Sequence, residues 1–180
     1  MSHGTTGSDD ARNDFVISVA NEQSRHAVDE EQLAAAMRAV LAKSPFSSAN
    51  VSLAIVDDPT IHQLNRRYLE HDWPTDVLSF VLDERDGHLE GEVILSADTA
   101  AASAAEIGWS VAAEQLLYAI HGALHLAGYD DKTAADARAM RAAEAEFLRG
   151  FGFEGPQDAE RGRAVGGRST VRSYDGASAK

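Results

Sequence analysis

The chain has 180 residues, 44% of them hydrophobic, which is enough for one compact domain with a hydrophobic core. It contains no cysteine, and this excludes disulfide bonds, thiolate catalysis and cysteine metal ligands. The formal net charge of −13 disfavours tight nonspecific binding to bare RNA, although it is compatible with an enzyme that has a small basic cleft.

The sequence contains no apolar run that approaches the roughly 20 residues of a membrane span. Its N-terminal residues also lack the apolar region of a signal peptide. We therefore expect a cytoplasmic protein with no membrane partner. Residues 1–14 and 154–180 are polar and contain glycine, and we expect both to be disordered extensions of a domain at residues 15–153. The arginines of the second extension are interpreted as those of a solvated tail.

Strands and helices alternate in the first half of the domain, and helices fill the second half. Strands are indicated by short β-branched runs and helices by apolar residues at helical spacing, as at Leu33, Met37 and Val40. In chain order we expect a strand at 15–20, a helix at 29–43, a strand at 51–56, a helix from 57–60 through Tyr68, strands at 76–82 and 92–96 around an exposed turn at 83–89, and helices at 97–107, 110–127 and 133–149. This order predicts a single α+β domain with a small mixed four-stranded sheet backed by helices.

The segment from His121 to Asp131 carries the residues best suited to metal chemistry. His121 and His125 are four residues apart on an expected helix, so both project from one face about one turn apart. Gly128 suits the left-handed position that ends a helix, after which the chain can bring Asp130 or Asp131 back towards the histidines. Two imidazoles and a carboxylate form a three-ligand set that leaves a position open for water, as in catalytic zinc sites.

A structural interpretation of the same residues is also open. The two histidines could be core residues of a buried helix, and Asp131 could cap the next one. Against this, Thr133 and Asp136 already form a capping pair for the last helix. In addition, two imidazoles without partners would be unfavourable on so apolar a helix.

At this point the sequence resembles the YbeY family of bacterial RNA-processing factors. HGALHLAGYDD is similar to the family pattern H-G-x-L-H-L-x-G-Y-D-H, and residues 64–80 resemble the family's LN-x-x-Y/W-R-x-x-D-x-P-T-D-V-L-S-F. Gly91-Glu92-Val93 and the closing FLRGFGF also match, so the resemblance covers roughly residues 15–153. It implies a metal-dependent endoribonuclease that acts on single-stranded RNA, matures ribosomal RNA and associates with the ribosome. Carried over by position, His121 and His125 match two metal ligands.

The sequence departs from the family pattern at two positions. The third family ligand is a histidine, and Asp131 occupies its place; a carboxylate can serve there, with one zinc ion per chain expected and Mn²⁺ as the alternative. The family's functional arginine is replaced by Leu69. Arg66 and Arg67 are nearby candidates for binding the substrate in its stead, although solvent-facing helix positions usually carry such charges, which favours the interpretation that both are ordinary surface arginines.

Three functions are therefore weighed. The first is the endoribonuclease, with weakened activity, whose nucleophile is either a metal-bound hydroxide or the 2′-OH of the RNA. The second is a non-catalytic, metal-binding ribosome-assembly factor, favoured by Leu69 and the acidic core. The third is a metalloprotease, which shares only the histidine spacing and lacks the glutamate that would follow His121 in H-E-x-x-H.

Overall fold

The computed structural model describes residues 14–69, 75–154 and 170–173. The first expected extension, apart from its last residue, lies outside this part of the chain, as does most of the second. Among the helices that the structure describes, none is both long enough and apolar enough to cross a membrane.

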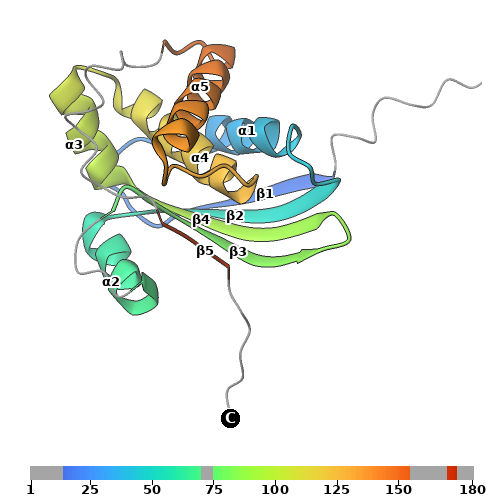
Figure 1. The fold of residues 1–180 in the computed structure, drawn as a ribbon. Coiled ribbons are helices and arrows are strands. Elements are labelled where there is room, and N and C mark those ends of the chain that lie inside the picture. Colours follow the sequence, from blue (N-terminus) through green and yellow to red (C-terminus); the bar gives the residue numbers. More distant parts are fainter. Residues whose placement is uncertain (1–13, 70–74, 155–169, 174–180) are drawn as a thin grey trace, which may run out of the picture.

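A single mixed sheet forms the centre of the fold (Figure 1). The strands lie in the order β1-β2-β4-β3-β5, with β3 and β4 antiparallel and the other neighbours parallel. Their bounds are β1 Phe15–Asn21, β2 Ser48–Val56, β3 Val77–Arg85, β4 His88–Ser96 and β5 Thr170–Ser173. The four strands expected from the sequence are all present, and the expectation of an α+β domain with a mixed sheet is confirmed.

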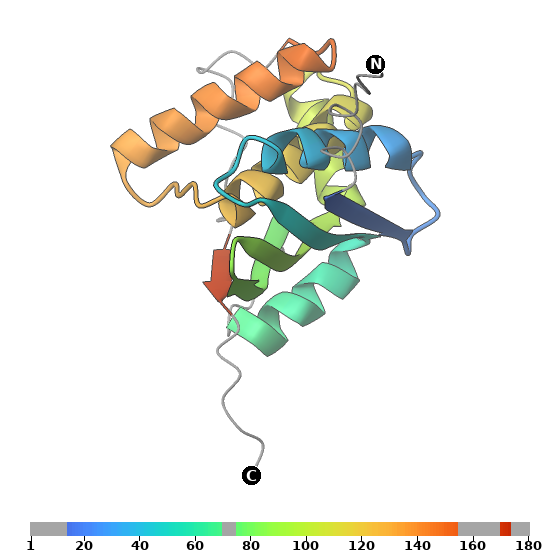
Figure 2. The same ribbon diagram turned by 90° about the vertical axis from the view of Figure 1, so that its right-hand side faces the viewer.

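Helices cover both faces of the sheet, but unequally (Figure 2). Helices α1, α4 and α5 lie on one side, with α4 between the sheet and α5, whereas α2 lies on the other side. The bounds are α1 Glu30–Leu41, α2 Asp58–Leu69, α3 Ala97–Ile107, α4 Val111–Leu126 and α5 Ala134–Gly150. The five expected helices are therefore present, and each begins and ends within about two residues of its expected bounds.

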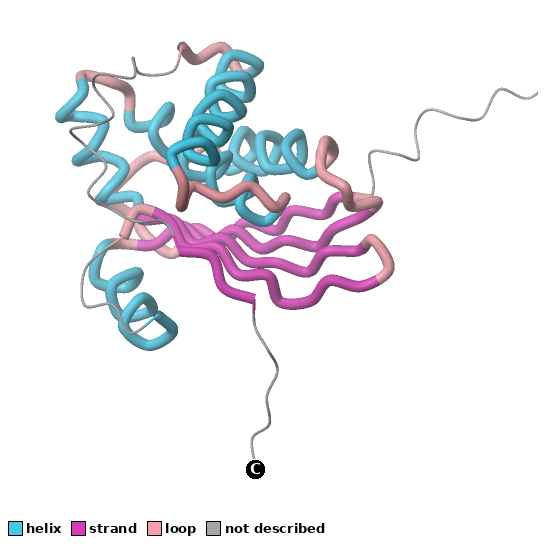
Figure 3. The backbone as a smooth tube through the Cα atoms, viewed as in Figure 1, coloured by secondary structure: helices cyan, strands magenta, loops and turns pink. Residues whose placement is uncertain are grey.

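Two features of the sheet differ from expectation. The segment 83–89 is not an open loop, because β3 and β4 continue to a tight turn at Asp86 and Gly87 (Figure 3). Both turn residues have positive φ, +53° and +79°, the combination that matches the twist of a two-residue hairpin. The second correction is β5, which adds a short strand from the expected disordered tail to the edge of β3. The unpaired backbone groups of an edge strand can pair with another segment whatever its side chains are. The polar composition of the tail therefore does not reveal this strand.

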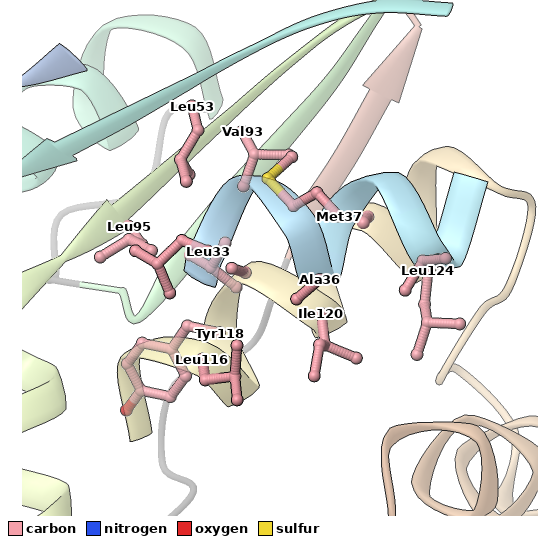
Figure 4. Packing of buried hydrophobic residues seen from close by; sticks show 14 of the residues in the cluster. Leu33, Ala36, Met37, Leu53, Val93, Leu95, Leu116, Tyr118, Ile120 and Leu124 are labelled. Atoms are coloured by element: carbon pink, nitrogen blue, oxygen red, sulfur yellow. The ribbon is translucent and has the colours of Figure 1, made fainter. Parts of the chain in front are cut away.

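The main core lies between the sheet and the α1–α4 layer. Alternate residues of β2 and β4 point into it, among them Leu53, Val93 and Leu95, and they meet the apolar stripe of α1 (Figure 4). The cluster includes Leu33, Ala36, Met37, Leu53, Val93, Leu95, Leu116, Tyr118, Ile120 and Leu124. A smaller cluster on the opposite face joins α2 to the sheet and consists of Val56, Ile61, Leu78, Phe80 and Ile94. The two clusters fix α4 and α2 on opposite faces.

Candidate metal centre

Helix α4 supplies the two histidines and lies directly on the sheet. Its first turn is capped by Ser110, whose hydroxyl accepts a hydrogen bond from the Ala113 amide at 3.1 Å. At Gly122 the helix approaches β3 and β4 closely, and the Gly122 carbonyl accepts a hydrogen bond from the Ser79 hydroxyl at 3.2 Å. This contact fixes the height of α4 over the sheet at the level of His121 and His125.

The two imidazoles face each other. His121 Nε2 and His125 Nε2 are 3.0 Å apart, and the ring planes are nearly perpendicular, with centroids separated by 4.6 Å. His125 is buried, whereas His121 is partly exposed. The i, i+4 spacing therefore does what the sequence predicts, because it directs both Nε2 atoms towards one point.

The chain turns back to this point after α4 ends. Gly128 has φ +94°, and the amides of Gly128 and Tyr129 donate to the carbonyls of His125 and Leu124, each at 3.0 Å, as in a Schellman motif. This turn brings Asp131 to the histidines: His121, His125 and Asp131 each offer a ligand atom, and these atoms lie within 4.8 Å of one another. The structure thus brings the three predicted residues together.

Asp131 is not the cap of the following helix. The Thr133 hydroxyl accepts a hydrogen bond from the Asp136 amide at 3.1 Å and donates to the Asp136 carboxylate at 2.6 Å. This confirms the capping pair expected from the sequence. The Asp131 side chain remains available at the centre, partly exposed to solvent.

In each histidine the other ring nitrogen, Nδ1, has a hydrogen-bond partner of its own. His125 Nδ1 lies 3.0 Å from the Tyr129 carbonyl oxygen, which can only accept, so Nδ1 carries the proton. His121 Nδ1 lies 2.6 Å from Glu144 Oε1. Glu144, on α5, is not among the candidate site residues predicted from the sequence. It does carry a signal there: it stands between the buried Met140 and Leu148 at helical spacing, as a charged residue within an apolar stripe.

Nearby carboxylates raise the pKa of the two histidines, whereas burial lowers it. Burial alone would lower the pKa of His121, but the hydrogen bond and charge of Glu144, together with Asp76 and Asp131, raise it above its ordinary value. The pKa of His125 is lowered by burial and by the neighbouring His121. Burial raises the pKa of Asp76, which directly precedes β3. The centre therefore combines two imidazoles with a surrounding negative charge.

This arrangement fits a divalent ion. Because the Nδ1 atoms of both histidines face acceptors, neutral rings would direct two bare Nε2 atoms at each other across 3.0 Å. A divalent metal ion with Zn–N bonds of about 2.0–2.1 Å would satisfy both lone pairs. Two nitrogen donors and one carboxylate are also the donor types found in catalytic zinc sites. The residues present are thus suited to hold the ion.

The candidate substrate-binding arginines lie elsewhere. Arg66 and Arg67 are exposed on α2, on the opposite face of the sheet from α4 (Figures 1 and 2), so the structure does not bring them to the histidine pair. The Arg67 guanidinium lies 5.4 Å from the centre of the exposed Tyr68 ring. A shallow depression on α2 is lined by Pro59, His62, Gln63, Arg66 and Arg67. Leu69 is the last residue of α2, and its side chain lies outside the described part of the structure.

Comparison with known proteins identifies relatives along most of the chain. Residues 18–152 match the family described as "Endoribonuclease YbeY". Endoribonuclease YbeY of Moorella thermoacetica is 41% identical over 151 residues, covering 76% of this chain and 97% of the relative. The protein of the same name from Syntrophotalea carbinolica is 41% identical over 140 residues, covering 74% and 93%. The solution structure of TM1509 from Thermotoga maritima has a similar fold, with a TM-score of 0.56 at 23% identity, covering 85% of this chain and all of that one.

Proposed function

The chain belongs to the YbeY family of endoribonucleases, and we propose that it cleaves single-stranded RNA with the help of one divalent ion held by His121, His125 and Asp131. The observation that carries this proposal is the convergence of two imidazole nitrogens and a carboxylate oxygen within 4.8 Å. When bound there, a divalent ion supplies Lewis-acid stabilisation of the charge that develops on the reacting phosphate.

The chain's own residues prepare this site before any ion binds. His125 keeps its proton on Nδ1, where the Tyr129 carbonyl accepts it at 3.0 Å, and so directs a bare Nε2 to the ion. Its lowered pKa favours the neutral ligand form. Asp131 supplies the charged oxygen from a turn that Gly128 makes possible. Three protein ligands leave a position for a phosphate oxygen or water, as catalysis requires.

Arg66 and Arg67 are proposed to bind RNA phosphates at a distance from the cleaved bond. They are exposed, and α2 lies on the far side of the sheet from the histidines, so contact with the reacting phosphate itself is not expected of them. Phosphate binding depends on lysine and arginine. A protein whose overall charge is acidic therefore needs local cationic groups such as these to bind RNA.

The proposal extends to the ion and to the cellular substrate. We expect zinc, with Mn²⁺ as the alternative, because Asp131 adds a hard oxygen ligand to the two imidazoles. Ribosomal RNA is the proposed substrate and the ribosome the proposed partner, as the resemblance to the family implies. A ribosomal partner also implies a cytoplasmic location.

One specific observation favours a second function, that of a non-catalytic ribosome-assembly factor. Leu69 stands where the family pattern has an arginine, and leucine cannot pair with phosphate. Such a protein would keep the fold and the ion and lose cleavage. A metalloprotease is disfavoured, because Gly122, in contact with the sheet, occupies the place of the required glutamate.

Metal analysis combined with RNA cleavage tests the proposal. Protein purified without added metal should contain close to one zinc or manganese per chain, and His121→Ala should contain almost none. Cleavage of a single-stranded RNA should exceed that of a duplex and should stop with a chelator. Unchanged metal content in the His121→Ala variant would falsify the assignment. A full metal complement without any cleavage would favour the assembly factor.

A further inference from the structure

Glu144 is a carboxylate placed where carboxylates are seldom found. It lies on α5 at the interface with α4 and is only 3% exposed, between the buried Met140 and Leu148. A buried charge is unfavourable unless hydrogen bonds and an opposite charge compensate it. The sequence therefore retains a charged residue at a position that packing alone would fill with an apolar one.

His121 is a compensating partner of Glu144. Glu144 Oε1 lies 2.6 Å from His121 Nδ1, which is the length of a strong, charge-assisted hydrogen bond. A carboxylate in this position accepts the proton of Nδ1, so it selects the ring form whose Nε2 has a free lone pair. That same Nε2 is the atom that faces His125 Nε2 at 3.0 Å.

Glu144 also sets the charge of the centre. Asp131 places one negative charge where the family pattern has a neutral imidazole, and Glu144 places a second one directly behind His121. Negative charges this close to the imidazoles favour the binding of a divalent cation.

We infer that Glu144 is a positioning residue of the metal centre, which orients His121 and strengthens its bond to a divalent cation from behind. This inference rests on the proposed function, because it requires that His121 is a ligand. Carboxylates that hold a ligating histidine typically contribute about 10–100-fold to metal affinity. The helix pair α4–α5 is then part of the metal centre as well as of the fold.

Zinc affinity of the full-length protein, measured by competition with a coloured chelator, tests the inference. Glu144→Gln keeps an acceptor for Nδ1 and removes the charge, whereas Glu144→Ala removes both. We expect zinc binding to weaken by roughly 10–100-fold in Glu144→Ala and by less in Glu144→Gln. Glu146→Gln is the matched control, because Glu146 lies two residues along α5, is exposed and pairs with Lys43. It should bind zinc as the wild type does.

A second measurement separates positioning from a structural role. The melting temperature is recorded for each protein without metal and with zinc at saturation. A positioning role predicts that zinc raises the melting temperature of Glu144→Gln less than that of the wild type. Equal zinc affinity and an equal zinc-induced increase in both would overturn the inference, even if the metal-free variant were less stable. If the wild type itself bound neither zinc nor Mn²⁺, the proposed function would fail first.

Discussion

Gly122 and Val93 lie so close together that a methyl group on Gly122 would overlap the valine. A Cβ built on Gly122 would lie 2.6 Å from Val93 Cγ1 and 3.1 Å from Ser79 Oγ. Real Cβ atoms do not approach neighbours to 2.6 Å, so α4, β4 or the Val93 side chain would have to shift. Glycine is thus required here for the approach of helix to sheet, between the two histidines.

The first prediction is that Gly122→Ala destabilises the protein. Overpacking of this kind typically lowers the free energy of unfolding by about 1–3 kcal/mol. Because α4 carries His121 and His125, the same shift should also weaken zinc binding. Denaturant unfolding and chelator competition measure the two effects. Gly150→Ala, where no atom lies within 4 Å of the added Cβ, is the control and should not lower stability. An unchanged midpoint in Gly122→Ala would contradict the packing argument.

Much of this geometry can be predicted from sequence, because it is local. The stripe of α1, the i, i+4 spacing of His121 and His125, and the Gly128 turn each depend on residues within a few positions of one another. The structure has them as expected. The hairpin turn at Asp86 and Gly87 is the local feature that was missed, since an Asp-Gly pair is itself a hairpin signal.

The rest could not be predicted because it depends on tertiary contacts. Glu144 reaches His121 across 23 positions of sequence, and only the packing of α5 on α4 brings them together. Periodicity identifies Glu144 as unusual but does not name its partner. Likewise, the composition of residues 170–173 does not reveal that the edge of β3 accepts them as a strand. The separation of Arg66 from the histidines also depends on which face of the sheet α2 covers.

The second prediction concerns stability and pH at Asp98. Its carboxylate accepts a hydrogen bond from the Asp58 backbone amide at 3.2 Å and lies 3.0 Å from His26 Nε2. The amide of Asp58, helped by His26 and Arg25, lowers the pKa of Asp98 below its ordinary value of 3.8. A lowered folded-state pKa means that the stabilisation is complete above pH 3.8 and is lost as the pH falls through the folded-state value.

Asp98→Asn should therefore lower the free energy of unfolding at pH 7 by about 1 kcal/mol. The difference from the wild type should shrink as the pH falls below about 4, where the wild-type carboxylate becomes protonated. Urea unfolding at a series of pH values measures it. Glu84→Gln, at an exposed position of β3, controls for the loss of one negative charge. A difference that stayed constant down to pH 2 would show that charge plays no part.

The third prediction addresses Asp131 as a ligand. Asp131→His would give the centre three imidazoles, as in the family pattern, and we expect zinc to bind more tightly at neutral pH; Asp131→Ala should weaken it. Both side chains bind a zinc ion at similar bond lengths. Chelator competition provides the affinities, with Asp83→His on the β3–β4 hairpin as the control. Were all of these proteins to bind zinc equally well, Asp131 would be a surface residue and no ligand.

The last prediction is that Leu69→Arg increases cleavage of single-stranded RNA by at least about tenfold. An arginine beside a reacting phosphate offers a planar, permanently charged fork, and loss of one such donor from a transition state typically lowers the rate by about 10²–10³-fold. The expected gain is a cautious part of that range. Cleavage rates on one short RNA are compared for the wild type, for Leu69→Arg and for Arg66→Ala combined with Arg67→Ala. Arg66 and Arg67 are exposed on α2 and are expected to act on RNA binding, so the double alanine variant should mainly raise KM. The expectation that position 69, at the end of α2, acts on kcat rests on the arginine of the family pattern. Strong wild-type cleavage that collapses in kcat in the double variant would show that the neighbouring arginines act at the reacting phosphate, and that Leu69 is not a defect.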